Sequence, residues 1–359
     1  MTREGTQKHK RSRAIHKILF VSDAWYPQMN GVVHAISKTK AELEALGLRV
    51  ALITPNGFWS LPCPSYPEIR LCLFPRQQVA QLIKAHNPDS IHIVTEGPLG
   101  LAARNYATRH NLAFTTAYHT RFPEYVRVRF RIPLSWTYAY LRWFHRPATA
   151  TMVSTPSIAK ALHQWRVGTP VLCRQGVDLG LFKPNPKLAP KRGKPVYLYV
   201  GRVAVEKNLE AFLQCPLDGE KWIVGDGPQR KQLKSRYGKG DQVTFWGAKP
   251  LTQLPDLYSQ ASVFVFPSKT DTFGLVLLEA MACGVPVAAY PVAGPLDVVG
   301  GAKAAALNED LAVACRKALT LNRREARRHA EKYSWHNATK TFQKHLVHVY
   351  NHAHARQSP

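Results

Sequence analysis

The stretch that most constrains the fold is residues 263–289, VFVFPSKTDTFGLVLLEAMACGVPVAA. It begins with β-branched and aromatic residues at 263–266, a run typical of a buried parallel strand. A polar loop over 267–272 ends the strand, and residues 274–283 then place leucine and alanine on one helical face. A second strand begins at 287–289. The pattern predicts a strand-loop-helix-strand unit, the element of parallel α/β sheets.

Two acids, Asp271 and Glu279, frame the loop and the helix of this unit. Helical side chains tilt toward the N-terminus, so the carboxylate of Glu279 can lean back toward the loop. A helix N-terminus binds anions, and Gly274 allows a phosphate to approach the backbone. The amides expected to face the ligand belong to Thr272, Phe273, Gly274 and Leu275. The pattern fits a diphosphate held between two hydroxylated groups, and it fits equally an ordinary βαβ unit with a solvated Asp and Glu.

The segment FGLVLLEAMACGVPVAA and the spacing of its two acids resemble the carboxylate-x7-carboxylate element of retaining GT-B glycosyltransferases of family 4. The resemblance implies that Asp271 lies near the transferred sugar and that Glu279 holds the ribose of the nucleotide. The family usually has Glu at the first position. Asp271 is one methylene shorter.

The charge balance is strongly basic, with 49 Lys and Arg against 23 Asp and Glu, a formal net charge of +26. Such a surface favours anionic partners: lipid headgroups, nucleic acid or anionic substrates. The six cysteines form no CxxC pair, which is typical of reduced thiols in a cytosolic protein. No apolar run is long enough to span a membrane, and the run after the basic tail 1–16 is too short for a signal peptide. We expect this tail to be disordered.

The first half of the chain alternates predicted strands with helices, which favours a doubly wound parallel sheet. A Pro-rich loop is predicted over residues 56–70. Gly31 ends the loop after the first strand, where a turn residue is the simplest interpretation; the resemblance instead brings its backbone near the donor phosphates or the acceptor. The predicted strands are 17–22, 49–54, 90–94, 114–118, 151–154 and 171–173, and the helices are 32–46, 79–86 and 99–109.

His119 falls at the carboxyl end of the strand 114–118, the edge where open α/β sheets bind ligands. A single histidine is more often structural than catalytic. The tract AYHTRFPEY nevertheless resembles the histidine segment of family 4, whose imidazole faces the donor sugar. We therefore favour a role in the site for His119.

Residues 121–147 interleave arginine with phenylalanine, tyrosine and tryptophan. Tyr and Trp suit a membrane interface and Arg suits lipid phosphates. A buried core helix with solvated arginines explains the pattern equally well. Binding of single-stranded nucleic acid is a third interpretation, ranked below the other two.

The second half begins after a linker at 178–195, with a strand at 196–200 followed by GRVAVEKNLEAF. Arg202 and Lys207 lie around a loop ahead of a helix, where two cations can converge on one phosphate group. Solvated basic loop residues are the simpler interpretation. The arrangement resembles the G-R-x5-K-N diphosphate clamp of family 4.

Together these features predict an α/β protein of the GT-B class, with two Rossmann-like doubly wound parallel-sheet domains facing a cleft. The expected boundaries are an acceptor domain at 17–177, a nucleotide-sugar domain at 196–332, and a C-terminal helix in 333–359 that crosses back to the first domain. The resemblance implies a nucleotide-sugar donor bound by the second domain. No D-x-D motif occurs, which favours donor binding without a metal, and no cofactor is expected.

The expected reaction is retaining transfer of a hexose to a lipid, lipid-linked or glycan acceptor by a cytoplasmic protein peripheral to the inner face of the cell membrane. GDP-mannose is the preferred donor because PSKTDTFGLV resembles the lipid-acting mannosyltransferase branch of the family. UDP-glucose and UDP-galactose are the alternatives. Other classes considered are a GT-B protein without activity, a sugar-nucleotide epimerase, and a basic nucleic-acid-binding protein; nucleic acid is disfavoured because no binding module is recognised.

Overall fold

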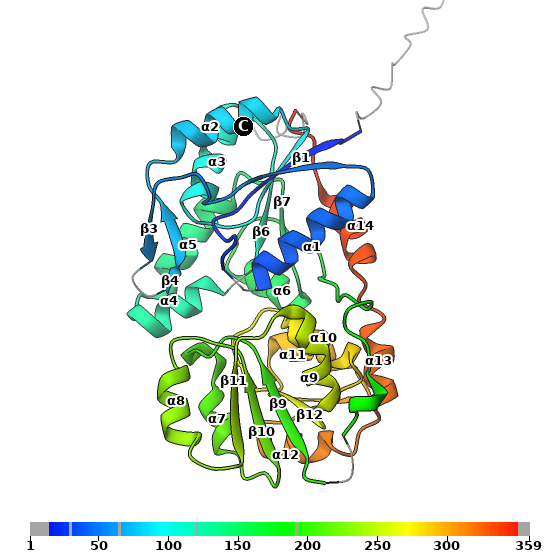
Figure 1. Ribbon diagram of the computed structural model, residues 1–359. Coiled ribbons are helices and arrows are strands. Elements are labelled where there is room, and N and C mark those ends of the chain that lie inside the picture. The colour runs from blue at the N-terminus through cyan, green and yellow to red at the C-terminus, as the bar shows by residue number, and fades with distance from the viewer. Residues whose placement is uncertain (1–13, 29–30, 64–65, 120, 191–192, 351–359) are drawn as a thin grey trace, which may run out of the picture.

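The chain folds into two α/β domains, one above the other in Figure 1. The computed structural model describes residues 14–28, 31–63, 66–119, 121–190 and 193–350, so the basic tail up to residue 13 lies outside the described residues. The N-terminal domain is built on a parallel sheet in the order β2-β1-β5-β6-β7-β8. Its strands are β1 (Lys17–Val21), β2 (Arg49–Ile53), β5 (Ser90–Ile93), β6 (Thr115–Tyr118), β7 (Ala150–Val153) and β8 (Pro170–Leu172).

The C-terminal domain is also built on a six-stranded parallel sheet, here in the order β11-β10-β9-β12-β13-β14. Its strands are β9 (Val196–Val200), β10 (Glu220–Val224), β11 (Val243–Gly247), β12 (Val263–Phe266), β13 (Val287–Ala289) and β14 (Ala305–Leu307). All four residues of β12 are buried, as the continuous apolar run predicts for a strand covered on both faces. The fold class expected from the sequence is therefore confirmed.

Helices cover both faces of each sheet, which explains why the central strands are apolar throughout. In the N-terminal domain, apolar side chains of α2 and α3 pack on one face and those of α1 on the other. The helices of this domain are α1 (Gly31–Ala45), α2 (Arg76–His86), α3 (Pro98–Arg109), α4 (Phe122–Phe130), α5 (Leu134–His145) and α6 (Pro156–Gln164). The later helices are α7 (Leu209–Gln214), α8 (Arg230–Tyr237), α9 (Leu254–Gln260), α10 (Leu275–Ala282), α11 (Ala293–Val299), α12 (Leu311–Ala318), α13 (Arg323–Ala330) and α14 (Trp335–His345).

The last helix, α14, lies against the N-terminal domain (Figure 1). Trp335 and Leu346 are buried, and the ring of Phe342 meets Phe20 of β1 edge-on with centroids 5.6 Å apart. The chain then stays on this domain, because the amide of Val349 donates to the carbonyl of Asp89 at 2.8 Å. The C-terminal segment thus ties the two domains together without adding a strand.

Direct polar contacts also join the domains. The carboxylate of Asp297 in α11 accepts hydrogen bonds from the amide and the hydroxyl of Ser157 at 2.9 and 3.0 Å, and so caps the N-terminus of α6 in the other domain. Lys38 of α1 pairs with Asp178 in the connecting segment at 2.6 Å. These contacts hold the carboxyl edges of the two sheets toward each other.

The prediction of a Pro-rich loop at 56–70 is wrong. Residues Ser60–Cys63 and Tyr66–Cys72 form β3 and β4, a two-stranded antiparallel ribbon beside the main sheet. Pro62 is tolerated because each strand of an isolated pair has an unpaired edge, where a missing N–H costs no ladder hydrogen bond.

Candidate active site

The candidate site lies where the order of the C-terminal sheet reverses. Strands β9 and β12 are neighbours there, and their chains continue in opposite directions across the sheet. Such a switch point is where open α/β sheets bind ligands, in a crevice outside the carboxyl ends of the strands. The loop after β9 carries Arg202 and Lys207, and the loop after β12 carries Asp271. Sheet topology therefore brings together residues that are 64 positions apart in the sequence.

The two loops are fastened to each other by several hydrogen bonds. The hydroxyls of Ser268 and Thr270 both donate to the carbonyl of Glu206, at 3.4 and 3.2 Å. The amide of the Asn208 side chain donates to the carbonyl of Pro267 at 3.2 Å. The loop positions are consequently fixed before any ligand binds.

Lys207 and Asp271 form an ion pair between these two loops. Both side chains are mostly shielded from solvent, at 22% and 15% exposure, so their attraction is screened less than that of a surface pair. The sequence singled out these two residues separately, one for a diphosphate and one for a sugar. The structure places them in direct contact, so a ligand that binds here meets both charges together.

Gly274 ends the loop and caps α10 with a left-handed backbone, φ +82°. A Cβ at this position would lie 3.0 Å from side-chain atoms of Leu277 and Phe266, so glycine is required by both conformation and space. The amides of Phe273, Gly274 and Leu275 have no hydrogen-bond acceptor within the described residues. They supply the donors that a helix N-terminus offers to an anion.

Glu279 lies inside α10 and is almost completely buried. The phenol of Tyr258, from α9, donates to its carboxylate at 3.0 Å. Burial raises the pKa of Glu279 to about 7, and the hydrogen bond from Tyr258 lowers it only in part. The carboxylate is therefore held at the edge of ionisation, and a ligand hydroxyl that donates to it would stabilise its charged form.

The N-terminal domain approaches this crevice at two points. Gly31 begins α1, and a Cβ built there would be 4.0 Å from Leu275 at the start of α10. The hydroxyl of Thr272 donates to the carbonyl of His119 at 2.8 Å. The N-termini of α1 and α10 thus lie close together, with His119 beside the loop that carries Asp271.

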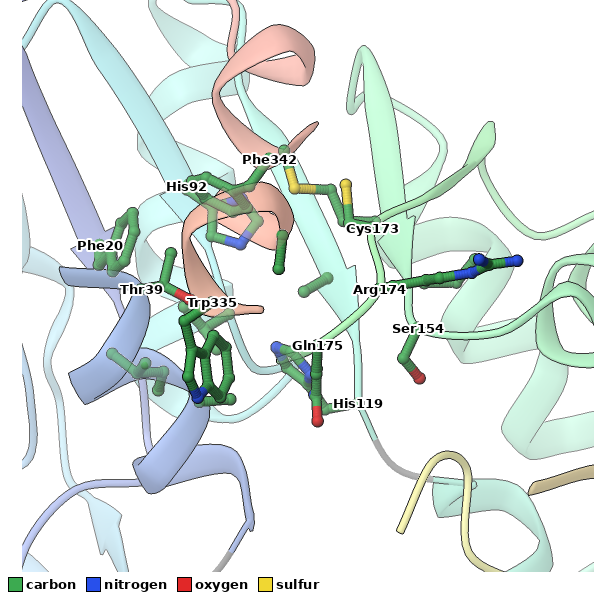
Figure 2. Close-up of a pocket in the computed structure, with 17 residues that line it drawn as sticks. Phe20, Thr39, His92, His119, Ser154, Cys173, Arg174, Gln175, Trp335 and Phe342 are labelled. Atoms are coloured by element: carbon green, nitrogen blue, oxygen red, sulfur yellow. The ribbon is translucent and has the colours of Figure 1, made fainter. Parts of the chain in front are cut away.

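The imidazole of His119 is partly buried, and burial lowers its pKa, a shift that nearby Glu96 opposes in part. It is consequently neutral at physiological pH. His119 also borders a small, mostly apolar cavity of about 50 Å³ between β1, β5–β7, α1 and α14 (Figure 2). Gln175 and Arg174 line the same cavity.

Sequence reasoning missed one polar partner of the site and the structural role of one carboxylate at a strand end. Tyr258 belongs to no recognisable motif, yet its phenol donates a hydrogen bond to Glu279, which lies 21 positions later in the sequence. Asp23 follows β1 and accepts hydrogen bonds from the amides of Leu99 and Gly100 at 2.8 and 3.3 Å, so it caps α3 rather than facing a ligand. In the sequence, the one indication of a role for Asp23 is its position directly after the predicted strand 17–22.

The residues described by the structure contain no group of three His, Cys, Asp or Glu side chains placed to hold a metal ion. The expectation of metal-free donor binding stays a prediction. Over the same residues, no helix has the length and apolar character needed to cross a membrane.

Two adjoining family matches span most of the chain. Residues 29–181 match Glycosyltransferase Family 4, and residues 183–335 match Glycosyl transferases group 1. The chain belongs to the group 1 glycosyltransferases. The Arg202, Lys207, Asp271 and Glu279 positions all lie in the second match. The resemblance stated from the sequence is thereby confirmed, and the protein is a glycosyltransferase.

Two relatives illustrate the range of donors in this family. The chain is 29% identical to a sulfoquinovosyl transferase of Arabidopsis thaliana over 78% of its own length and 60% of the relative's. It is 28% identical to a GDP-mannose-dependent alpha-mannosyltransferase of Mycobacterium tuberculosis, over 79% of this glycosyltransferase and 81% of the relative. The names differ in the sugar transferred, so the relatives leave the donor open.

A solved structure supports the fold. The sucrose-phosphate synthase of Thermosynechococcus elongatus superposes with a TM-score of 0.71, 23% identity, and coverage of 92% of this chain and 98% of that one. Similarity at this level shows the two-domain GT-B architecture.

Proposed function

We propose that this glycosyltransferase transfers a hexose, preferably mannose from GDP-mannose, to a lipid or lipid-linked acceptor, with retention of the anomeric configuration. The observation that carries the proposal is the Lys207–Asp271 pair beside the unpartnered amides that open α10, with buried Glu279 in the same helix. A diphosphate needs cations and N–H donors, a ribose needs a hydroxyl acceptor, and both needs are met within one crevice.

Each residue has one task in this proposal. Lys207 and Arg202 bind the diphosphate, and the amides of Phe273 to Leu275 add hydrogen bonds to it. Glu279 accepts from the ribose hydroxyls, and Asp271 accepts from a hydroxyl of the sugar. Because the donors are preorganised and partly shielded from water, they stabilise the charge that develops on the leaving group.

During transfer, the bond between the anomeric carbon and the phosphate oxygen breaks, and its electron pair stays on the diphosphate. The acceptor oxygen forms a new bond to the anomeric carbon on the same face. The proton of the acceptor hydroxyl passes to the departing phosphate oxygen. No side chain needs to act as a nucleophile, and no metal or cofactor is required in this scheme.

The first domain supplies the acceptor side. Neutral His119 lies beside the Asp271 loop and is placed to accept or donate one hydrogen bond to the sugar without adding charge. The basic surface of the chain supports an acceptor at an anionic membrane, and we propose that the enzyme acts from the cytoplasm at the inner face of the cell membrane.

The test is a nucleotide-release assay with GDP-mannose, UDP-glucose and UDP-galactose on the full chain. The proposal expects GDP release from GDP-mannose, lost in Asp271→Asn and retained in Asp241→Asn, a matched change at an exposed carboxylate. Release from UDP-sugars alone would overturn the donor assignment. Equal release by wild type and Asp271→Asn would overturn the site. The anomeric configuration of the product, read by NMR, tests retention.

A further inference from the structure

The β3–β4 ribbon presents one apolar face to solvent. Leu61 pairs directly with Leu71, and the amide of Leu73 donates to the carbonyl of Trp59 at 2.7 Å. Side chains alternate along a strand, so these four residues lie on the same face of the ribbon. Their exposed fractions are 87% for Trp59, 57% for Leu61, 37% for Leu71 and 36% for Leu73. Phe74, just beyond the ribbon, is 93% exposed.

The opposite face of the ribbon fixes this orientation. Cys72 points inward and is buried in the same apolar cluster as alanines of α3 and Phe144 of α5. A shift of register by one residue would expose Cys72 and bury the leucines, so packing locks the apolar side outward. The exposed face is therefore a fixed feature of the fold.

Helices α4 and α5, which also carry exposed aromatic residues, lie on the same side of the domain as the β3–β4 ribbon (Figure 1). Trp136, Trp143 and Phe122 are exposed, whereas Tyr138 and Leu141 of α5 are buried. The guanidinium of Arg104 in α3 lies 3.9 Å from the ring centroid of Trp143 and donates to its carbonyl. Helix α3 thus holds α5 next to the ribbon.

Basic residues outnumber acidic ones in the segments that carry these residues, although β4 itself contains Glu68. Arg70, Arg76, Arg127 and Arg131 are exposed. Between positions 97 and 177 the only acidic residue is Glu124, whose carboxylate accepts a hydrogen bond from buried Tyr138. A partner that binds this surface must therefore provide both an apolar region and negative charge.

We propose that the outer face of the β3–β4 ribbon, together with Phe74 and the exposed aromatics of α4 and α5, inserts into the interface of an anionic lipid bilayer. Trp and Phe suit the boundary between headgroups and acyl chains, and arginines at the edge pair with lipid phosphates. This proposal extends the membrane-interface hypothesis for residues 121–147 to the β3–β4 ribbon, which was not predicted from the sequence. It rests on the proposed function only in assigning the acceptor to that bilayer.

The test compares wild type with the double variant Trp59→Ser/Phe74→Ser in co-sedimentation with vesicles of phosphatidylglycerol and phosphatidylcholine, and of phosphatidylcholine alone. A matched control is Val313→Ser/Leu319→Ser, two exposed apolar residues on and just after α12 in the other domain. Nucleotide affinity, measured in parallel without vesicles, reports on folding and on the donor site independently of membrane binding.

The proposal expects wild type and control to bind anionic vesicles and to release as salt rises, with the ribbon variant at least tenfold weaker and nucleotide affinity unchanged. Equal vesicle binding by all three proteins would overturn it. Sedimentation velocity provides a second test. If wild type is a dimer and the ribbon variant is a monomer, this face is an interface between two copies of the chain, and the membrane proposal is overturned. Failure of nucleotide binding in wild type would instead count against the proposed donor site.

Discussion

Both domains are built on a six-stranded parallel sheet, but one strand, β2, lies beyond β1 in the first sheet, whereas two, β10 and β11, lie beyond β9 in the second. The domains also differ in what they place at the carboxyl edge and on the outside. At its switch point, the C-terminal domain holds an ion pair, a buried carboxylate and free helix amides. The N-terminal domain presents a neutral histidine, and its own strand-end carboxylate, Asp23, is occupied by capping α3. Outside, the N-terminal domain adds the apolar ribbon. Two parallel sheets of the same size thus carry charged groups at the carboxyl edge in one half, and a neutral histidine with an exposed apolar ribbon in the other.

The difference shows that chemistry is set by few side chains and not by the fold. Both domains place strand ends toward each other, yet among the described residues the charged groups of the candidate site come from the C-terminal domain, and the N-terminal domain adds neutral His119. Changes in that domain are expected to alter nucleotide binding and turnover. Changes on the outer surface of the N-terminal domain are expected to alter stability or membrane binding instead.

The largest expected effect tests the two faces of α5 in the N-terminal domain. Tyr138→Ala removes a buried ring that is stacked on Trp165, with centroids 4.2 Å apart, and should cost about 3–5 kcal/mol of unfolding free energy. Trp136→Ala, on the exposed face, should stay within about 0.5 kcal/mol of wild type. Urea denaturation measures both. A loss of several kcal/mol in the unfolding free energy of Trp136→Ala would indicate that residues 121–147 form a core segment throughout.

Lys207→Ala should lower turnover by about 10²–10³-fold, because the developing charge on the diphosphate loses a preorganised cation. Asp271 would also lose its partner, so the double variant Lys207→Ala/Asp271→Asn should lose less than the sum of the two single changes in free energy. Steady-state kinetics with the active donor provides all four values. Additive losses would show that the pair does not act as a unit during transfer.

Glu279→Ala should weaken donor binding by about 1.5–3 kcal/mol, or roughly ten- to a hundredfold, because ribose hydroxyls would lose a buried acceptor. Calorimetry with the nucleotide sugar measures the loss. Exposed Glu331→Ala, which breaks only a surface pair with Arg327, is the control. An affinity within twofold of wild type in folded Glu279→Ala would exclude the ribose role.

The smallest effect concerns pH. The pKa of Glu279 is raised to about 7 in the free protein, so below pH 7 the donor must displace a proton before its hydroxyls meet a carboxylate. Affinity for the nucleotide sugar should therefore rise as pH increases through 7, by at most about tenfold per pH unit, and level off above it. Glu279→Gln should remove this dependence. If the affinity of Glu279→Gln depends on pH in the same way as that of wild type, a group other than Glu279 is responsible for the pH dependence.

The sequence by itself determined the alternation of strands and helices and the position of the loops that form the candidate site. These features depend on short-range patterns: apolar runs, glycines at helix ends and the eight-residue spacing of Asp271 and Glu279. The local pattern of residues places Gly31 at the end of a loop, and in the structure Gly31 begins α1 and lies near the start of α10. Local pattern suffices wherever a motif is contained in one βαβ unit.

Only the tertiary structure decided which side chains meet across the sheet. The contact of Lys207 with Asp271, the phenol of Tyr258 on Glu279, and the inward orientation of Cys72 all join segments distant in sequence. The ribbon escaped prediction because its prolines suggest a loop, whereas an isolated two-stranded pair tolerates them at its edges. Which face of such a pair is buried depends on what packs against it, and no local pattern contains that information.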